Sequence, residues 1–121
     1  MSTSSAADLI AAHQQLIERA HARGIKIIGG TLTPFEGSRI AWSPEIEQKR
    51  KTFNEWIRTG KAYDGVFDAD AAMRDPSHPS KLLQQYNSGD NLHPNNEGYE
   101  VMTKAIDLEL FRVDPRTSAT R

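Results

Sequence analysis

Hydrophobic residues recur every three or four positions along three stretches of the chain, and this spacing predicts three amphipathic helices. The first helix lies between Ser5, an expected N-cap, and Gly24, an expected stop. The second follows Ser43, and the third runs from Asn95 to about Phe111. On the third helix we expect the buried face to carry Tyr99, Met102, Ala105, Ile106 and Leu110.

The second helix, which we expect to end at Gly60, has two different faces. Its inward face is predicted to carry the apolar residues Ile46, Phe53, Trp56 and Ile57. Its consecutive polar and basic residues are expected on the solvated side, and these are Gln48, Lys49, Arg50 and Lys51.

Two short runs rich in β-branched and aromatic residues predict two parallel strands, Ile25–Leu32 and Gly65–Asp68. The order helix, strand, helix, strand, helix is typical of an α/β fold with right-handed crossovers. Thr33 and Phe35 follow the first strand at its carboxyl end, which is the side on which open α/β sheets bind ligands. The polar residues 77–87 are predicted to form a loop.

Composition excludes several classes of function. The chain has 121 residues with a formal net charge of −1, and it has no cluster of basic residues that would bind nucleic acid or an anionic membrane. It contains no cysteine, which excludes disulfides and thiolate catalysis. No apolar run reaches the roughly 18 residues that a membrane span needs, and residues 1–5 lack the features of a signal peptide. These features assign no compartment, and secretion of a full-length form is compatible with them.

The most informative stretch is residues 88–99, where Asp90 and His93 are three positions apart on a predicted turn. A carboxylate at that distance can accept one imidazole N–H and leave the other ring nitrogen free as a proton acceptor. Pro94 prevents a helix from including His93, so the turn is expected to be well fixed. Two other interpretations stay open: a simple surface hydrogen bond, or a metal site to which Asp75 or His78 also contributes.

The string from Gly89 to Tyr99, Gly-Asp-Asn-Leu-His-Pro-Asn-Asn-Glu-Gly-Tyr, resembles the last conserved block of the SGNH or GDSL-type hydrolases. In that family a D-x-x-H-P element supplies the acid and the base of a Ser-His-Asp triad. The resemblance implies that Asp90 is the orienting acid and His93 the base. The family often has a similar Thr-x-Thr-Pro-Phe segment, which implies that Thr33 and Phe35 bind substrate at the mouth of the active site. A simple turn at the end of the strand is the alternative for these two residues.

The resemblance covers only part of an SGNH fold, which has five parallel strands in three α/β/α layers and is flavodoxin-like. We therefore expect residues 1–113 to form the C-terminal portion of one such domain, with 114–121 as a flexible tail. The Gly-Asp-Ser block that carries the family's nucleophile is not found, since Gly89 and Asp90 are followed by Asn91. An exposed edge of a two-stranded sheet would allow self-association.

The resemblance implies an ester hydrolase of the Ser-His-Asp type that needs neither a metal nor another cofactor. Its substrate would be a carbohydrate acetyl ester or a small lipid or aryl ester. Because the nucleophile is lacking, we expect the chain to be inactive alone. Two alternatives remain, namely a non-catalytic remnant that serves as an interaction module and an O-acyltransferase with the same triad chemistry.

Overall fold

The computed structural model describes residues 5–111. The helices are α1 (Ala6–Ala22), α2 (Pro44–Thr59), α3 (Ala69–Met73) and α4 (Asn96–Ala105), with 3₁₀ turns η1 (Gln84–Tyr86) and η2 (Leu108–Phe111). The strands are β1 (Ile28–Gly30), β2 (Gly65–Phe67), β3 (Arg74–Asp75) and β4 (His78–Leu82). The tail predicted for residues 114–121 lies outside the described part of the chain.

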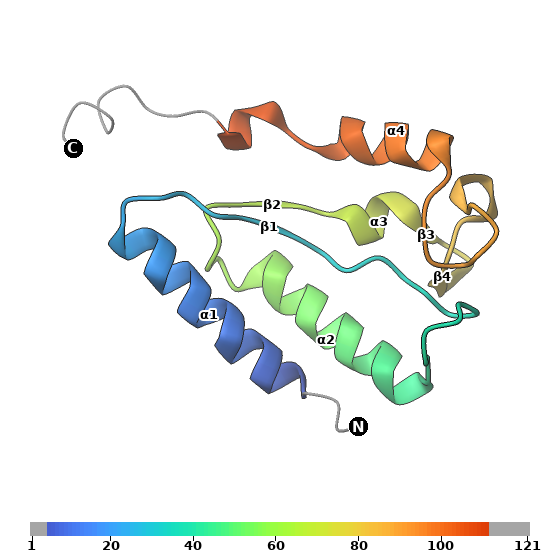
Figure 1. Cartoon of the computed structure of the whole chain (residues 1–121), viewed down its shortest axis with the longest axis horizontal. Coiled ribbons are helices and arrows are strands. Elements are labelled where there is room, and N and C mark those ends of the chain that lie inside the picture. Colours follow the sequence, from blue (N-terminus) through green and yellow to red (C-terminus); the bar gives the residue numbers. More distant parts are fainter. Residues whose placement is uncertain (1–4, 112–121) are drawn as a thin grey trace.

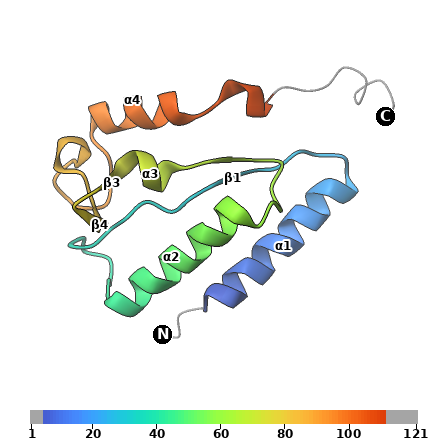
Figure 2. The same cartoon turned by 180° about the vertical axis from the view of Figure 1, so that it is seen from behind.

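The central element is the parallel pair β1 and β2, in which Gly29 is aligned with Val66. Figures 1 and 2 show α1 and α2 along one side of this pair and α4 along the other. The α/β class and the parallel pairing predicted from the sequence are therefore confirmed. The complete three-layer domain of an SGNH hydrolase and self-association at a sheet edge stay predictions.

The predicted helix starts are confirmed, because local side chains satisfy the first backbone N–H groups. The Ser5 hydroxyl accepts a hydrogen bond from the Asp8 amide at 3.0 Å, and the Ser43 hydroxyl caps α2 in the same way. Asn95 caps α4 by accepting the Gly98 amide at 2.8 Å. Asp68 caps α3 by accepting the Ala71 amide at 3.1 Å.

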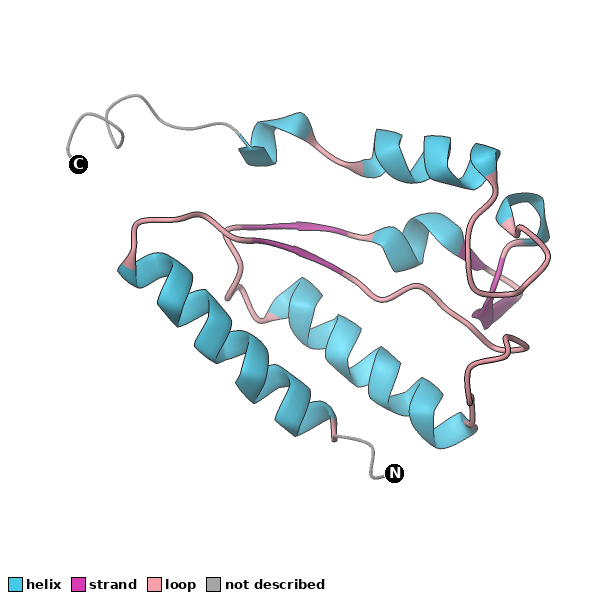
Figure 3. Cartoon of the chain, viewed as in Figure 1, coloured by secondary structure: helices cyan, strands magenta, loops and turns pink. Residues whose placement is uncertain are grey.

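Both parallel strands are shorter than predicted (Figure 3). Before β1, the Ile27 amide donates to the Asp64 carboxylate at 2.7 Å, so a side chain takes the place of a ladder bond. After β1, the buried Asn54 amide binds both backbone groups of Leu32, accepting from its N–H at 2.7 Å and donating to its C=O at 2.8 Å. These side chains satisfy the backbone beyond the strand and end the regular pairing.

The prediction of an unstructured loop over residues 77–87 was wrong. Part of that segment forms β4, which pairs antiparallel with β3 through an irregular register. The sequence of β4, His-Pro-Ser-Lys-Leu, lacks the alternation of apolar and polar residues that predicts a strand, because only Leu82 is buried. The resulting β3–β4 hairpin brings the chain to the turn that carries Asp90 (Figure 1).

The last helix is also shorter than predicted. It ends at Ala105 because Ile106 is extended, and Asp107 then accepts the Glu109 amide at 3.0 Å to start η2. Tyr99 and Ala105 were both expected to be buried, but Tyr99 is 50% exposed and Ala105 is exposed as well. Leu110 packs closely on β2, where a β-carbon on Gly65 would lie 2.5 Å from its Cδ2.

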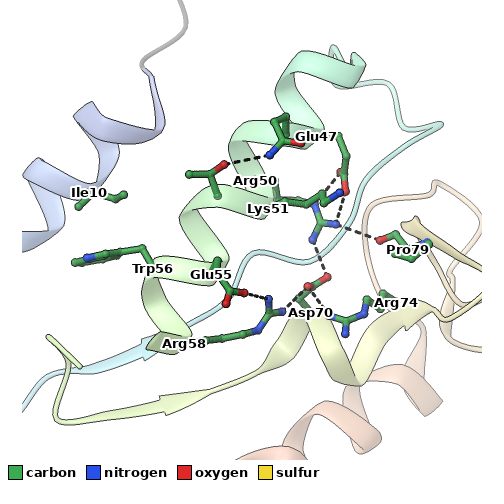
Figure 4. Close-up of a pocket in the computed structure, with 12 residues that line it drawn as sticks. Ile10, Glu47, Arg50, Lys51, Glu55, Trp56, Arg58, Asp70, Arg74 and Pro79 are labelled. Atoms are coloured by element: carbon green, nitrogen blue, oxygen red, sulfur yellow. Dashed lines mark hydrogen bonds and ion pairs between the residues drawn. The ribbon is translucent and has the colours of Figure 1, made fainter. Parts of the chain in front are cut away.

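The prediction that Arg50 lies on a solvated face was wrong, because its side chain is only 3% exposed. Its guanidinium donates to Glu47 at 2.9 and 2.6 Å, to Asp70 at 2.7 Å and to the carbonyl oxygen of Leu32 at 2.8 Å. Asp70 also pairs with Arg58 at 2.6 Å and with Arg74 at 2.8 Å. This charged cluster, drawn in Figure 4, joins α2 to α3 and to the end of β1. Burial is tolerated because carboxylates neutralise the guanidinium groups.

Candidate acid–base site

Asp90 and His93 form a direct hydrogen bond, with the Asp90 Oδ2 atom 2.7 Å from the His93 Nδ1 atom. The other carboxylate oxygen, Oδ1, accepts the backbone amides of Leu92 at 2.9 Å and His93 at 2.8 Å. The Ser88 hydroxyl donates to the same oxygen at 3.0 Å. The hydrogen bond from the His93 ring and those from the two backbone amides strongly lower the pKa of Asp90, so its carboxylate stays ionised.

The turn that carries this pair is held at both ends. The Asn87 Oδ1 atom accepts the amides of Gly89 at 2.9 Å and Asn91 at 3.1 Å. The Ser88 amide donates to the His93 carbonyl at 3.1 Å, and Asn87 and Pro94 form an isolated antiparallel β-bridge. The pair is therefore fixed by a network of short-range hydrogen bonds rather than placed on a loose loop.

The pair is open to solvent, with 63% of the His93 side chain and 46% of the Asp90 side chain exposed. Within residues 5–111 the second ring nitrogen of His93, Nε2, has no hydrogen-bond partner. The exposed ring can therefore meet an incoming molecule without first breaking a protein contact.

Thr33 and Phe35 lie on the loop that leaves β1, and both side chains are half-buried. Neither forms a hydrogen bond with Asp90 or His93 in the described part of the chain. The same loop reaches the turn two residues later, where the Asn91 side-chain amide donates to the Gly37 carbonyl at 3.2 Å. The sequence did not single out this contact, although the run of asparagines at 87, 91 and 95 was a visible signal for a side-chain network.

A polar cavity of about 590 Å³ lies beside the turn. The turn contributes Asn87, Gly89 and Asn91 to its wall. The hairpin and the start of η1 contribute Asp75, His78, Lys81, Leu82 and Gln84. Amide, carboxylate, imidazole and ammonium groups therefore surround this space, with Leu82 as its apolar residue.

No serine hydroxyl among the described residues hydrogen-bonds to His93. Ser88 donates to the acid rather than to the base, and Ser80 donates to Glu36. Ser38 donates to the Ile40 carbonyl at 3.4 Å. None of these contacts has the arrangement of an activated nucleophile, which must lie against the imidazole.

The metal interpretation gains no support from the described residues. Between residues 5 and 111, no group of three or more His, Asp or Glu side chains is arranged to hold a metal ion. His78 instead pairs with Glu36, with 3.0 Å between Nε2 and Oε1.

A second cavity, of about 660 Å³, borders the charged cluster of Figure 4 and includes no residue of the turn. Arg50, Arg58 and Arg74 face it, but each is paired with a carboxylate. These three guanidinium groups are already neutralised within the protein, so we assign no ligand to this space.

Geometry alone does not single out His93, because His21 also binds a carboxylate, Asp64, at 2.8 Å. That contact joins the end of α1 to the residue before β2, which is the amino end of the parallel pair. The turn with His93 instead meets the loop that follows β1, at the carboxyl end, where open α/β sheets bind ligands.

Comparison with known families identifies the family of the chain, and the matched range contains both of these pairs. The model of the GDSL-like lipase/acylhydrolase family matches residues 2–101, a range that includes the turn. The chain belongs to the GDSL-like lipase/acylhydrolase family. No curated protein matches the chain. Membership in an acylhydrolase family supports activity on esters and the α/β class of the fold. Within residues 5–111 of this GDSL-like chain, no helix is long and apolar enough to span a membrane.

Proposed function

We propose that this chain supplies the acid and base of a Ser-His-Asp ester hydrolase, with His93 as general base and Asp90 as the acid that orients it. The observation that carries the proposal is the hydrogen bond of 2.7 Å between Asp90 Oδ2 and His93 Nδ1. It occurs inside the stretch matched by the GDSL-like family. The hydrogen bond to Nδ1 selects the tautomer whose Nε2 carries a lone pair.

In the proposed reaction, His93 Nε2 removes the proton of a serine hydroxyl while the serine oxygen attacks the ester carbonyl carbon. The tetrahedral intermediate then collapses, the C–O bond to the alcohol breaks, and the imidazolium returns its proton to the leaving alcohol. Water attacks the acyl-enzyme by the same steps and releases the acid. Asp90 stays ionised throughout and stabilises the imidazolium.

We further propose that the 121-residue chain does not hydrolyse esters by itself. Among the described serines, Ser88 is the one tied to the pair, and its hydroxyl faces the carboxylate of Asp90 rather than the ring of His93. Without a positioned hydroxyl no acyl-enzyme can form, and each missing oxyanion donor costs about 10²–10³ in rate. The same observation favours a second candidate, a non-catalytic module that keeps the turn without the chemistry.

For the substrate we propose an ester with a hydroxylated alcohol portion, such as an acetylated sugar. The polar cavity beside the turn supports this choice, because Asp75, Lys81 and Gln84 can hydrogen-bond to hydroxyl groups but would bury a long acyl chain poorly. Thr33 and Phe35, on the loop that meets the turn, are proposed as substrate contacts.

Labelling with a fluorophosphonate probe, followed by peptide mapping, tests this proposal. The 121-residue chain and its His93→Ala variant should both remain unlabelled. In the polypeptide made from the complete reading frame, the probe should label one serine, and that serine should lie outside this chain. Stoichiometric labelling of one serine in the 121-residue chain, lost in His93→Ala, would show that the chain is a complete hydrolase. If the complete polypeptide is neither labelled nor active on acetylated sugars and p-nitrophenyl acetate, the non-catalytic module is correct.

A further inference from the structure

We infer that Asn91 is a positioning residue, which fixes the orientation of the Asp90–His93 turn relative to the loop that leaves β1. The inference rests on the proposed function, since it concerns how that acid–base pair is aligned. Asn91 lies between the two proposed catalytic residues, and its side chain points to two separate partners, Asn87 and Gly37.

The first observation is the backbone conformation of Asn91. Its φ of 61° lies in the left-handed region, which few residues other than glycine and asparagine adopt readily. Gly37 and Gly89 also have positive φ values, of 90° and 114°. Glycine adopts positive φ without strain, so Asn91 is the residue of these three whose left-handed conformation costs energy, and such a residue is often part of a functional site.

The second observation is the set of hydrogen bonds that Asn91 makes. Its Oδ1 atom accepts from the Asn87 side-chain amide at 2.8 Å, while its backbone amide donates to Asn87 Oδ1 at 3.1 Å. Its Nδ2 atom donates to the Gly37 carbonyl at 3.2 Å, across 54 positions of sequence. In the described residues this last bond is the one hydrogen bond that joins the turn 87–95 to the loop 31–43.

The third observation is how closely Gly37 fits against Asn91. A β-carbon on Gly37 would lie 3.3 Å from Asn91 Nδ2, and the positive φ of Gly37 would strain any other residue there. The carbonyl of Gly37 is set by a tight turn in which the Ser38 amide donates to the Phe35 carbonyl at 3.1 Å. Asn91 thus binds the acid–base turn to the segment that carries Phe35.

Different contacts hold the acid–base pair together and hold it against the neighbouring loop. The bond between Asp90 and His93, with the two backbone amides on Asp90 Oδ1, holds the pair together internally. Asn91 holds that unit in place against the neighbouring loop. Loss of the Asn91 side chain should leave the pair formed but allow it to shift as a unit, and a misplacement of about 1 Å costs roughly 10²-fold in rate.

The test compares Asn91→Gly, which keeps the left-handed backbone and removes both side-chain bonds, with Asn91→Asp. The aspartate keeps the acceptor for Asn87 but loses the donor to the Gly37 carbonyl. The matched control is Gln85→Ala, which removes an exposed side-chain bond to Glu97 outside the turn. In the polypeptide made from the complete reading frame, both Asn91 variants should lower kcat by about 10- to 100-fold with little change in KM, and the control should not.

A His93→Ala variant measured alongside separates the two claims. If His93→Ala keeps its activity, the proposed function fails; if His93→Ala is inactive while both Asn91 variants keep kcat within twofold, only the positioning inference fails. Nuclear magnetic resonance of the 121-residue chain decides the inference without turnover. Asn91→Gly should keep the His93 Nδ1–H resonance and add exchange broadening to the amides of residues 88–93. Unchanged relaxation of those amides would overturn the inference.

Discussion

Replacing Asp70 by asparagine should destabilise this protein strongly, although Asp70 is remote from the acid–base turn. The Asp70 side chain is only 5% exposed and binds three guanidinium groups, those of Arg50, Arg58 and Arg74 (Figure 4). An asparagine has nearly the same shape but no charge, so the substitution removes the electrostatic attraction with little change in packing.

The size of the effect follows from what each arginine keeps. Arg50 is 3% exposed and retains Glu47, while Arg58 retains Asp68. Arg74 is 36% exposed, so water can replace its lost partner. Removing one partner of a buried ion pair costs about 3–5 kcal/mol, and the retained carboxylates place the expected loss near the lower end, at about 3 kcal/mol. A chain of this length has a total stability of roughly 6–18 kcal/mol, so the loss would be a large fraction of it.

The assay is urea unfolding followed by tryptophan fluorescence. With a slope of about 1.5 kcal/mol per molar urea, Asp70→Asn should lower the midpoint by about 2 M. Asp75→Asn is the matched control, because its carboxylate makes only a short-range bond to the Ser77 amide at 2.8 Å. A loss below about 1 kcal/mol for Asp70→Asn, or an equal loss for Asp75→Asn, would refute the structural role given to the charged cluster.

Three further predictions concern stability. Asn54→Ala should cost about 1–3 kcal/mol in urea unfolding, since it leaves the buried Leu32 N–H without its partner, while the Leu32 carbonyl keeps its bond from Arg50; a loss under 0.5 kcal/mol, taken as roughly the limit for surface changes, would contradict this. Burial would raise the pKa of Asp68, but its bonds from Arg58, the Ala71 amide and Thr31 outweigh that effect and lower the pKa from 3.8 to about 2. Asp68 therefore stabilises the fold above its unfolded pKa of 3.8, and this contribution should disappear as the pH falls from 3.8 to about 2. When stability is measured against pH, Asp68→Asn should not show the loss that the wild type shows over this pH range. Identical curves for the wild type and the variant would show that Asp68 makes no such contribution. Gly98→Ala should cost about 1–3 kcal/mol by calorimetry, because the added β-carbon would lie 2.9 Å from the Tyr86 carbonyl oxygen; an unchanged melting temperature would show that this contact relaxes freely.

The parts of the structure that the sequence predicted correctly are local. The caps at Ser5, Ser43 and Asn95 depend on side chains three positions from the amides they accept. The contact between Asp90 and His93 is likewise set within one turn, because Asp90 also binds the backbone amide of His93.

The parts that were predicted wrongly depend on partners far away in the chain. Arg50 is buried because Asp70, 20 positions later, neutralises it, and no pattern within α2 contains that information. Strand β1 ends earlier than predicted because Asn54, 22 positions beyond Leu32, binds the backbone of Leu32. The role proposed for Asn91 depends on Gly37, 54 positions earlier, which the periodicity of neither segment could indicate.

The most direct test of the proposed function is the turnover of an acetyl ester by the polypeptide made from the complete reading frame, compared with its His93→Ala variant. If His93 is the general base, the variant should lose at least about 10³-fold in kcat, because sites without a triad member retain only the binding and oxyanion contributions. The bond of 2.7 Å from Asp90 predicts a large loss for Asp90→Asn as well, since an amide favours the wrong imidazole tautomer. A loss below tenfold in His93→Ala, with the fold intact, would show that His93 is not the base.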